Sequence, residues 1–258
     1  MILLLSPAKT LDFTTPPVTA QATQPAHLKA AAELMTLLRP LDAPALGKLL
    51  GISEALALLN VGRNAQWKRT GNLGNSKQAV LAFNGDAYGG LGAPTLGAAD
   101  LAFAQDHLRI LSGLYGCLRP LDLIQPYRLD MGTRLSNPRG KDLYAFWGDR
   151  LTRELAQAML QTADAGPVLV NLASEEYFKA VAAAELPGPV LTPVFEDWKN
   201  GTFKVISFYA KRARGLMCRF AIQGRIQDPA QLKRFTAEGY RFAKEASGAD
   251  RWVFRRKV

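Results

Sequence analysis

Residues 190–207, VLTPVFEDWKNGTFKVIS, decide the fold. Two runs rich in β-branched and aromatic residues flank Asn200-Gly201, a dipeptide typical of tight hairpin turns, so the stretch predicts an antiparallel pair of strands. Two other runs, Ile2–Leu5 and Pro167–Leu172, are short and continuously apolar, which is typical of buried strands.

Apolar residues at helical spacing separate these strands. They predict helices over residues 26–38, 43–50, 53–60, 97–107, 149–162 and 207–223, with another beginning at Asp228-Pro229. Further strands are expected over residues 78–83, 109–114 and 252–256. Ser174 and Ser207 are expected to cap the helices that follow them. Because strands and helices mix without strict alternation, we expect the α+β class: a single domain over residues 1–258, with a mixed β-sheet flanked by helices.

The composition is that of an ordinary globular protein. The 258 residues are 48% hydrophobic, and no run approaches the roughly 20 apolar residues of a membrane span. Cys117 and Cys218 form neither a disulfide framework nor a zinc spacing, which indicates a reducing compartment. The N-terminus lacks the basic start and long apolar run of a signal peptide. We therefore expect a cytoplasmic protein that has no membrane partner.

The sequence lacks the familiar motifs for metals, cofactors and nucleophiles. His27 and His107 stand in no metal-ligand spacing. We find no GxSxG motif, no GxGxxG motif after a strand and no redox cysteine pair. We therefore expect no metal and no cofactor, and the sequence does not support direct iron storage.

The net positive charge comes from the basic C-terminal portion, residues 204–258. Through Phe203 the chain has 18 basic and 18 acidic residues, whereas the C-terminal portion has 14 basic and 4 acidic ones and so supplies the whole formal charge of +10. Such a surface, interleaved with aromatic residues, most often meets a polyanion, and nucleic acid is the leading one. We expect these cations to converge on one concave strip.

The helix predicted after Ser207 contains the densest part of this charge. Its apolar residues fall on one side, and its cations, Lys211, Arg212, Arg214 and Arg219, fall on the other. The charged side either faces phosphates or is simply solvated. Gly215, in the helix interior, predicts the close approach of another backbone or of a ligand.

A helix-hairpin-helix element is predicted at about residues 43–60, where the chain reads LGKLLGISEALALL from Leu46. Such elements grip a phosphate through backbone N–H groups without reading sequence. The glycine would form the turn, the isoleucine would anchor it in the core and the serine would cap the second helix. The candidate residues are Lys48, Gly51, Ile52 and Ser53. A plain αα corner is the alternative.

Polar loops follow several of the expected strands, where ligand groups often lie. The loop SPAKT at Ser6–Thr10 is either an anion site or a capped turn with a solvated lysine. Asp86 and Glu176 could act as acid and base if they meet in space. The candidate residues of a small-molecule site are Asp86, Tyr88, Asn171, Ser174 and Glu176.

Six longer segments occur in a characteristic order: LLLSPAKTLDF, VLAFNGDAYGGL, ILSGLYGCLRPLDLIQPYRLDMGTRL, LYAFWGD, LVNLASEEYFK and FKVISFYAKRARGLMCRF. They resemble the family of the peroxide stress resistance protein YaaA. The resemblance implies a protein of the oxidative stress response that limits iron-dependent damage. It also implies an α+β fold with a positively charged cleft and a helix-hairpin-helix element, and binding to duplex or branched DNA without sequence preference. The cleft residues that it implies are Lys9, Arg128, Lys204, Lys211, Arg214 and Arg219.

Two functions remain open from the sequence. The first is a non-catalytic, sequence-tolerant DNA-binding protein, a monomer in solution that can bind DNA cooperatively. The second is an enzyme that acts on a nucleotide or another phosphorylated small molecule in a pocket lined by Lys9, Asp86, Arg128, Glu176 and Lys204. A small deep pocket favours the enzyme, and a long open groove favours DNA.

Overall fold

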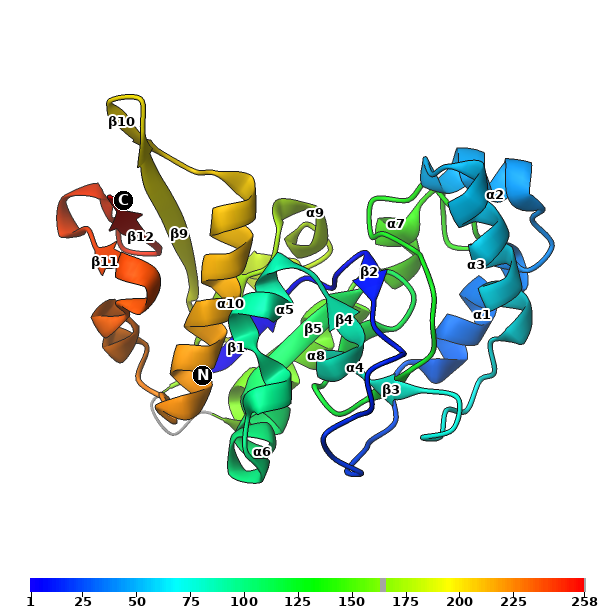
Figure 1. Ribbon diagram of the computed structural model, residues 1–258, viewed down its shortest axis with the longest axis horizontal. Helices are drawn as coiled ribbons and strands as arrows, with labels where there is room; N and C mark the ends of the chain where they lie inside the picture. The colour runs from blue at the N-terminus through cyan, green and yellow to red at the C-terminus, as the bar shows by residue number, and fades with distance from the viewer. Residues whose placement is uncertain (163–165, 258) are drawn as a thin grey trace.

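The computed structural model describes residues 1–162 and 166–257, and its centre is an eight-stranded mixed sheet (Figure 1). In spatial order, seven of the strands are β11 (Arg241–Phe242), β12 (Arg251–Arg256), β9 (Val190–Lys199), β8 (Leu169–Leu172), β1 (Ile2–Leu5), β5 (Leu108–Ser112) and β6 (Gly116–Leu118). The eighth, β10 (Thr202–Lys204), pairs with β9. Strands β12, β9, β8, β1 and β5 are parallel, and the other three are antiparallel to their neighbours.

Helices flank this sheet, which confirms the α+β class. Over the described residues they are α1 (Leu28–Leu38), α2 (Ala43–Leu50), α3 (Glu54–Gln66), α4 (Ala79–Ala82), α5 (Asp86–Leu91), α6 (Ala98–His107), α7 (Leu143–Trp147), α8 (Arg150–Gln161), α9 (Glu175–Phe178) and α10 (Ser207–Gln223). Two short ribbons pair β2 (Thr10–Leu11) with β4 (Phe83–Asn84) and β3 (Lys77–Gln78) with β7 (Leu123–Ile124). Helix α10 packs on α5, α6 and β9, whereas α1, α2 and α3 lie together at the opposite end of the molecule from β12 (Figure 1).

The continuous apolar runs of the sequence are the central strands of the sheet. Every residue of β1, β5 and β8 is buried. Strands with helices on both faces have no solvent side, which explains why their apolar residues do not alternate with polar ones. The predicted hairpin is also confirmed: β9 and β10 are joined by Asn200 and Gly201, whose φ angles are 53° and 82°.

Three local predictions are wrong. The strand expected over residues 78–83 is the short helix α4 between β3 and β4. All four residues of α4 are buried, and a short apolar run that is buried on every side does not distinguish a strand from a helix. Ser207 is the first residue of α10 rather than its cap, and Ser174 precedes α9 without a side-chain capping hydrogen bond.

Helices α5 and α10 pack backbone against backbone. A Cβ atom at Gly215 would overlap the carbonyl oxygen of Ala87, and a Cβ atom at Gly90 would overlap that of Arg212. Because glycine alone lacks this atom, the two helices approach more closely than side chains would allow. The close approach predicted at Gly215 is therefore confirmed, and it fixes α10 relative to the first turn of α5.

Length and apolar composition decide whether a helix can span a membrane. Among residues 1–162 and 166–257, no single helix is long and apolar enough to cross a bilayer. The pair α2 and α3 has sufficient length and apolar composition when the two are taken together, but the pair bends by 107° between its halves.

Candidate functional site

The direction of the chain across the sheet reverses next to β1. Along the chain, the next strand of this sheet after β1 is β5, which pairs with β1 on one side. The next strand after β8 is β9, and β8 and β9 lie on the other side of β1. Ligands of open sheets bind outside the carboxyl ends of the strands at such a switch point. The loops after the two strands are joined here, because the backbone N–H of Ser174 donates to Ser6 Oγ at 2.7 Å.

A cavity of about 530 Å³ lies at this switch point. Its wall consists of the loop after β1, the first turn of α5, the residues after β8 and one side of α10. The expected site residues that line it are Lys9, Asp86, Tyr88, Ser174, Glu176, Lys211 and Arg214. The Tyr88 hydroxyl donates to Ser6 O at 3.0 Å, and burial raises the pKa of this hydroxyl, so it remains a hydrogen-bond donor at neutral pH.

Three cations of the described chain line the cavity: Lys9, Lys211 and Arg214. Lys211 is exposed and forms no ion pair with any described residue. Lys9 lies 3.4 Å from Asp130 and is largely exposed. Arg214 is partly buried, and no residue of the described chain forms a hydrogen bond or an ion pair with it. Burial lowers the pKa of the Arg214 guanidinium, as expected for a charge that is removed from water without a counter-ion. Arg214 is therefore the cation of this cavity best placed to bind an anionic ligand.

The two carboxylates that the sequence singles out line the same cavity. Asp86 is exposed at the first position of α5. Glu176 is engaged by the protein itself, since its Oε1 accepts a hydrogen bond from the backbone N–H of Gly132 at 3.0 Å and its carbonyl oxygen accepts one from the Tyr144 hydroxyl at 2.9 Å. Glu176 thus attaches the loop of residues 130–136 to α9.

A second hollow, of about 920 Å³, extends from this cavity toward α2. Glu176 is the one described residue that lines both hollows, and we call the two hollows together the switch-point groove. The second hollow adds Lys48, Gly51 and Arg134 to the lining. Among the described residues, five cationic side chains line the groove: Lys9, Lys48, Arg134, Lys211 and Arg214. Four carboxylates of the same part of the chain line it as well: Asp86, Asp130, Glu175 and Glu176.

The turn between α2 and α3 lies at one end of the groove. Gly51 has the left-handed conformation expected of the turn, with φ of 62°. Ile52 is only partly buried and does not pack in the core, so its expected anchoring role is not observed. Ser53 occupies the N-cap position of α3, but its side chain makes no capping hydrogen bond. The first N–H groups of α3 therefore have no side-chain acceptor from the cap residue.

Two of the expected cleft arginines are bound by the protein itself. Arg219 donates from Nη1 to the carbonyl oxygens of Leu91 and Gly92, at 3.0 Å each, and so caps the end of α5. Arg128 lies 3.3 Å from Asp130, which also pairs with Lys9. Neither arginine lines either hollow of the groove, so the cleft role expected of them is not supported.

Asn171 and Lys204 do not line either hollow of the groove. Asn171 is buried on β8, and its Oδ1 accepts a hydrogen bond from the backbone N–H of Ala173 at 3.1 Å, which shapes the turn after the strand. Lys204 is exposed on β10. The sequence could not separate these residues from the lining, because they belong to the same motifs.

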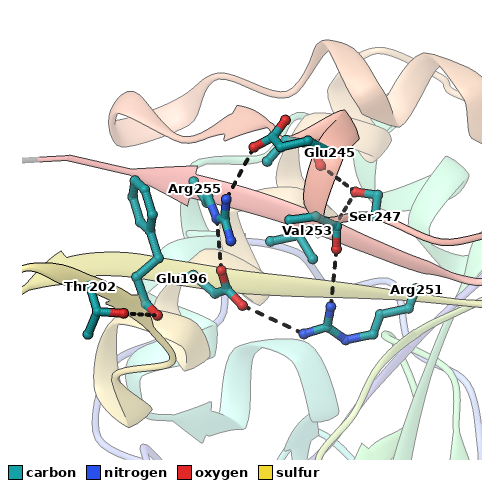
Figure 2. A network of polar contacts seen from close by, with 10 residues as sticks. Glu196, Thr202, Glu245, Ser247, Arg251, Val253 and Arg255 are labelled. Atoms are coloured by element: carbon teal, nitrogen blue, oxygen red, sulfur yellow. Dashed lines mark hydrogen bonds and ion pairs between the residues drawn. The ribbon is translucent and has the colours of Figure 1, made fainter.

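The cations of the basic C-terminal portion do not form one concave strip. Five of them are paired with carboxylates: Arg212, Arg225, Arg251, Arg255 and Arg256. Figure 2 shows one such network, in which Arg255 donates to Glu196 at 2.9 Å and Arg251 lies 3.6 Å from the same carboxylate. From this portion of the chain, Lys211 and Arg214 line the groove.

Both thiols are placed away from solvent. Cys117 and Cys218 are fully buried, and burial raises the pKa of each thiol. Because the thiolate is the form that attacks peroxide, buried protonated thiols react slowly. Among residues 1–162 and 166–257, no three His, Cys, Asp or Glu side chains gather as they would around a metal ion.

The molecule is an α+β protein, and the hollow at the switch point of its mixed sheet is lined by both cationic and acidic side chains. The chain belongs to the family of the peroxide stress protein YaaA, whose model matches residues 1–246. It is also similar over its whole length to proteins of the UPF0246 group. The relatives from Ralstonia nicotianae, Aromatoleum aromaticum and Azoarcus sp. are 63%, 59% and 60% identical over 258, 260 and 259 residues, which is 100%, 100% and 99% of those proteins. Membership of this family supports a role in peroxide stress.

Proposed function

We propose that the protein binds DNA in the switch-point groove without reading its sequence, and that this binding serves the peroxide stress response by limiting iron-dependent damage. The observation that carries the proposal is the set of five cationic side chains that line the two hollows of the groove. One hollow includes Gly51 after α2, the other includes Lys211 and Arg214 of α10, and Glu176 lines both. A concave surface with spaced cations suits a sugar-phosphate strand better than an isolated basic helix does.

The two ends of the groove would contact phosphates in different ways. At one end, Lys211 and Arg214 are free of carboxylate partners among the described residues and can neutralise phosphates directly. At the other end, Gly51 lines the groove shortly before α3 begins. The first N–H groups of α3 are not capped by the Ser53 side chain, and Glu54 places one carboxylate in the first turn. Such a helix terminus favours an anion through its N–H groups and its dipole.

Both kinds of contact address the backbone of the nucleic acid rather than the edges of its bases. Phosphate contacts fix the position of a protein on DNA but carry no sequence information directly. Tolerance of sequence therefore follows from the chemistry of the groove, in agreement with the function that the sequence segments imply.

The double variant Lys211→Glu/Arg214→Glu tests the proposal. Fluorescence anisotropy with a labelled 20-base-pair duplex should show affinity lowered by roughly 10- to 100-fold on duplexes of unrelated sequence, because two phosphate contacts become repulsive. The matched control is Arg234→Glu/Lys244→Glu, which changes the net charge equally at two exposed cations outside both hollows. Equal losses in the two double variants would refute the groove as the DNA site.

A second candidate function is the binding or turnover of a phosphorylated small molecule in the cavity at the switch point. Its specific support is that Arg214, Asp86 and Glu176 line one cavity of about 530 Å³. Enclosed cavities of a few hundred Å³ are typical of small-molecule sites. Thermal-shift measurements with nucleoside mono-, di- and triphosphates test this function. A rise in Tm that Arg214→Gln abolishes would support it, and no rise with any of them would count against it.

A further inference from the structure

A third hollow, of about 580 Å³, lies beside the edge strand β6. It shares no lining residue with the switch-point groove. Arg109 near the start of β5 and Arg119 just after β6 both line it, and the antiparallel pairing of the two strands brings these positions together. The hollow therefore lies at the amino end of β5, away from the carboxyl end of β1.

Guanidinium groups from three elements surround this hollow, which we call the arginine pocket. Arg109 comes from β5, Arg119 from the residue after β6, and Arg150 and Arg153 from α8. The amides of Gln24, Gln157 and Gln161 complete the polar lining. These arginines are not part of the basic C-terminal portion, so the overall charge distribution gives no sign of them.

Arg109 is the most deeply placed of the four, with 7% of its surface exposed. Its Nη1 donates to the carbonyl oxygens of Gln105, Asp106 and Leu108 at 3.0, 3.2 and 2.9 Å. No carboxylate of the described chain pairs with it, so its charge is uncompensated. Its Nε and Nη2 atoms form no hydrogen bond with the described chain, and the residue lines the hollow.

Arg150 is uncompensated in the same way. Its Nε donates to the carbonyl oxygen of Trp147 at 3.2 Å, and its guanidinium stacks 4.8 Å from the centre of the Phe146 ring. Burial, followed by the nearby charge of Arg139, lowers the pKa of Arg150, and the charges of Glu33 and Asp149 offset this only in part. Two guanidinium groups inside the hollow thus lack a counter-ion within the described chain.

The remaining charges of the pocket are partly balanced. Arg153 pairs with Asp149 at 2.8 Å, and Arg119 lies 3.3 Å from Asp122. Glu154 lines the hollow as well, and its Oε2 atom lies 2.5 Å from Nε2 of His27. Among the described residues, Arg109 and Arg150 are therefore the two guanidinium groups of the lining that have no carboxylate partner.

We propose that the arginine pocket binds a soluble oligophosphate, such as a di- or triphosphate chain. A guanidinium pairs with phosphate or carboxylate oxygens through a planar fork of N–H groups. The guanidinium groups here come from a strand, a turn and a helix, so they approach from different directions. Linked tetrahedral phosphates present oxygens in several directions and can meet more of these forks than a planar carboxylate can. The lining contains no Phe, Tyr or Trp on which a base could stack.

Isothermal titration calorimetry of the full chain with sodium triphosphate tests the proposal at constant ionic strength. We expect saturable binding of one triphosphate. Gln157→Glu places a carboxylate in the pocket from an exposed position of α8 and should weaken binding about tenfold. Arg150→Gln should weaken it at least as much, through loss of a charged contact.

Two control variants test whether triphosphate binding depends on the arginine pocket itself. Arg139→Gln removes a guanidinium that stacks 4.5 Å from the same Phe146 ring but does not line the pocket, so binding should be unchanged. Arg234→Gln, at an exposed cation that lines none of the three hollows, should also leave triphosphate binding unchanged. No binding, equal binding in Gln157→Glu, loss in Arg234→Gln, or tighter binding of citrate than of triphosphate would each overturn the proposal.

Discussion

Replacing Gly215 with alanine tests whether the contact between α5 and α10 supports the groove. In an open helix this change would stabilise the protein by about 1 kcal/mol, because alanine has the higher helix propensity. Here the new Cβ atom would overlap Ala87 O and lie 2.8 Å from Leu91 N, and neither backbone atom can turn aside as a flexible side chain can. Overpacking of a well-packed core costs about 3 kcal/mol at the upper end of its usual range. We therefore expect a net loss of about 2 kcal/mol in the free energy of unfolding.

Urea unfolding followed by circular dichroism measures this loss, and a thermal scan should show Tm lowered by roughly 4–8 °C. Gly62→Ala in α3 is the matched control, because a Cβ atom there would meet nothing within 4 Å. That variant should gain up to about 1 kcal/mol from helix propensity alone. A Gly215→Ala protein that is as stable as the parent would refute the backbone contact.

Three further outcomes are expected. Arg256→Met leaves the buried Asp197 carboxylate without the partner that lies 2.6 Å away, and should cost about 3–5 kcal/mol in urea unfolding. Arg153→Met breaks an exposed pair and should cost less than about 1 kcal/mol, and similar losses in the two variants would contradict this difference. Burial lowers the pKa of His107, so the folded state takes up fewer protons than the unfolded state, and stability should fall as the pH drops below about 6.5. His107→Gln should flatten this pH dependence. An unchanged slope of stability against pH would contradict the role of His107. The two buried thiols should react with a disulfide reagent at pH 8 only after unfolding, and rapid labelling of the folded protein would contradict their placement.

Much of the fold could be predicted because local pattern and tertiary environment agree. The runs that became β1 and β8 are apolar throughout and are buried on both faces, and Asn200-Gly201 adopts the positive φ angles that its hairpin turn requires. The run that became α4 is ambiguous for a physical reason. Four residues buried on all sides satisfy a helical turn as well as a strand, so periodicity could not decide between them.

The candidate site was less predictable, because charge in a sequence does not reveal its counter-charge. The partner of Arg225 is Asp100, and the partner of Arg256 is Asp197, and both acids lie far from these arginines in the chain. Arg219 belongs to the same basic helix as Arg214, yet it caps α5 whereas Arg214 lines the groove. Local spacing predicts which side of a helix a residue occupies, but not what packs against that side.

The arginine pocket could not be predicted from the local charge of the sequence either. Its cations lie where basic and acidic residues balance along the chain, so no local excess of charge marks them. Their proximity arises from the pairing of β5 with β6 and from the packing of α8 on β6. Such a site becomes visible once the register of the sheet is known.

The affinity for duplex DNA as a function of salt concentration tests the groove most directly. Five cationic side chains line it, so the logarithm of the association constant plotted against the logarithm of salt concentration should have a slope of roughly −4 to −5. Lys211→Glu/Arg214→Glu should reduce the steepness by about 2. Binding whose affinity does not change between 50 and 200 mM salt, or no binding at either concentration, would contradict a groove that neutralises phosphates.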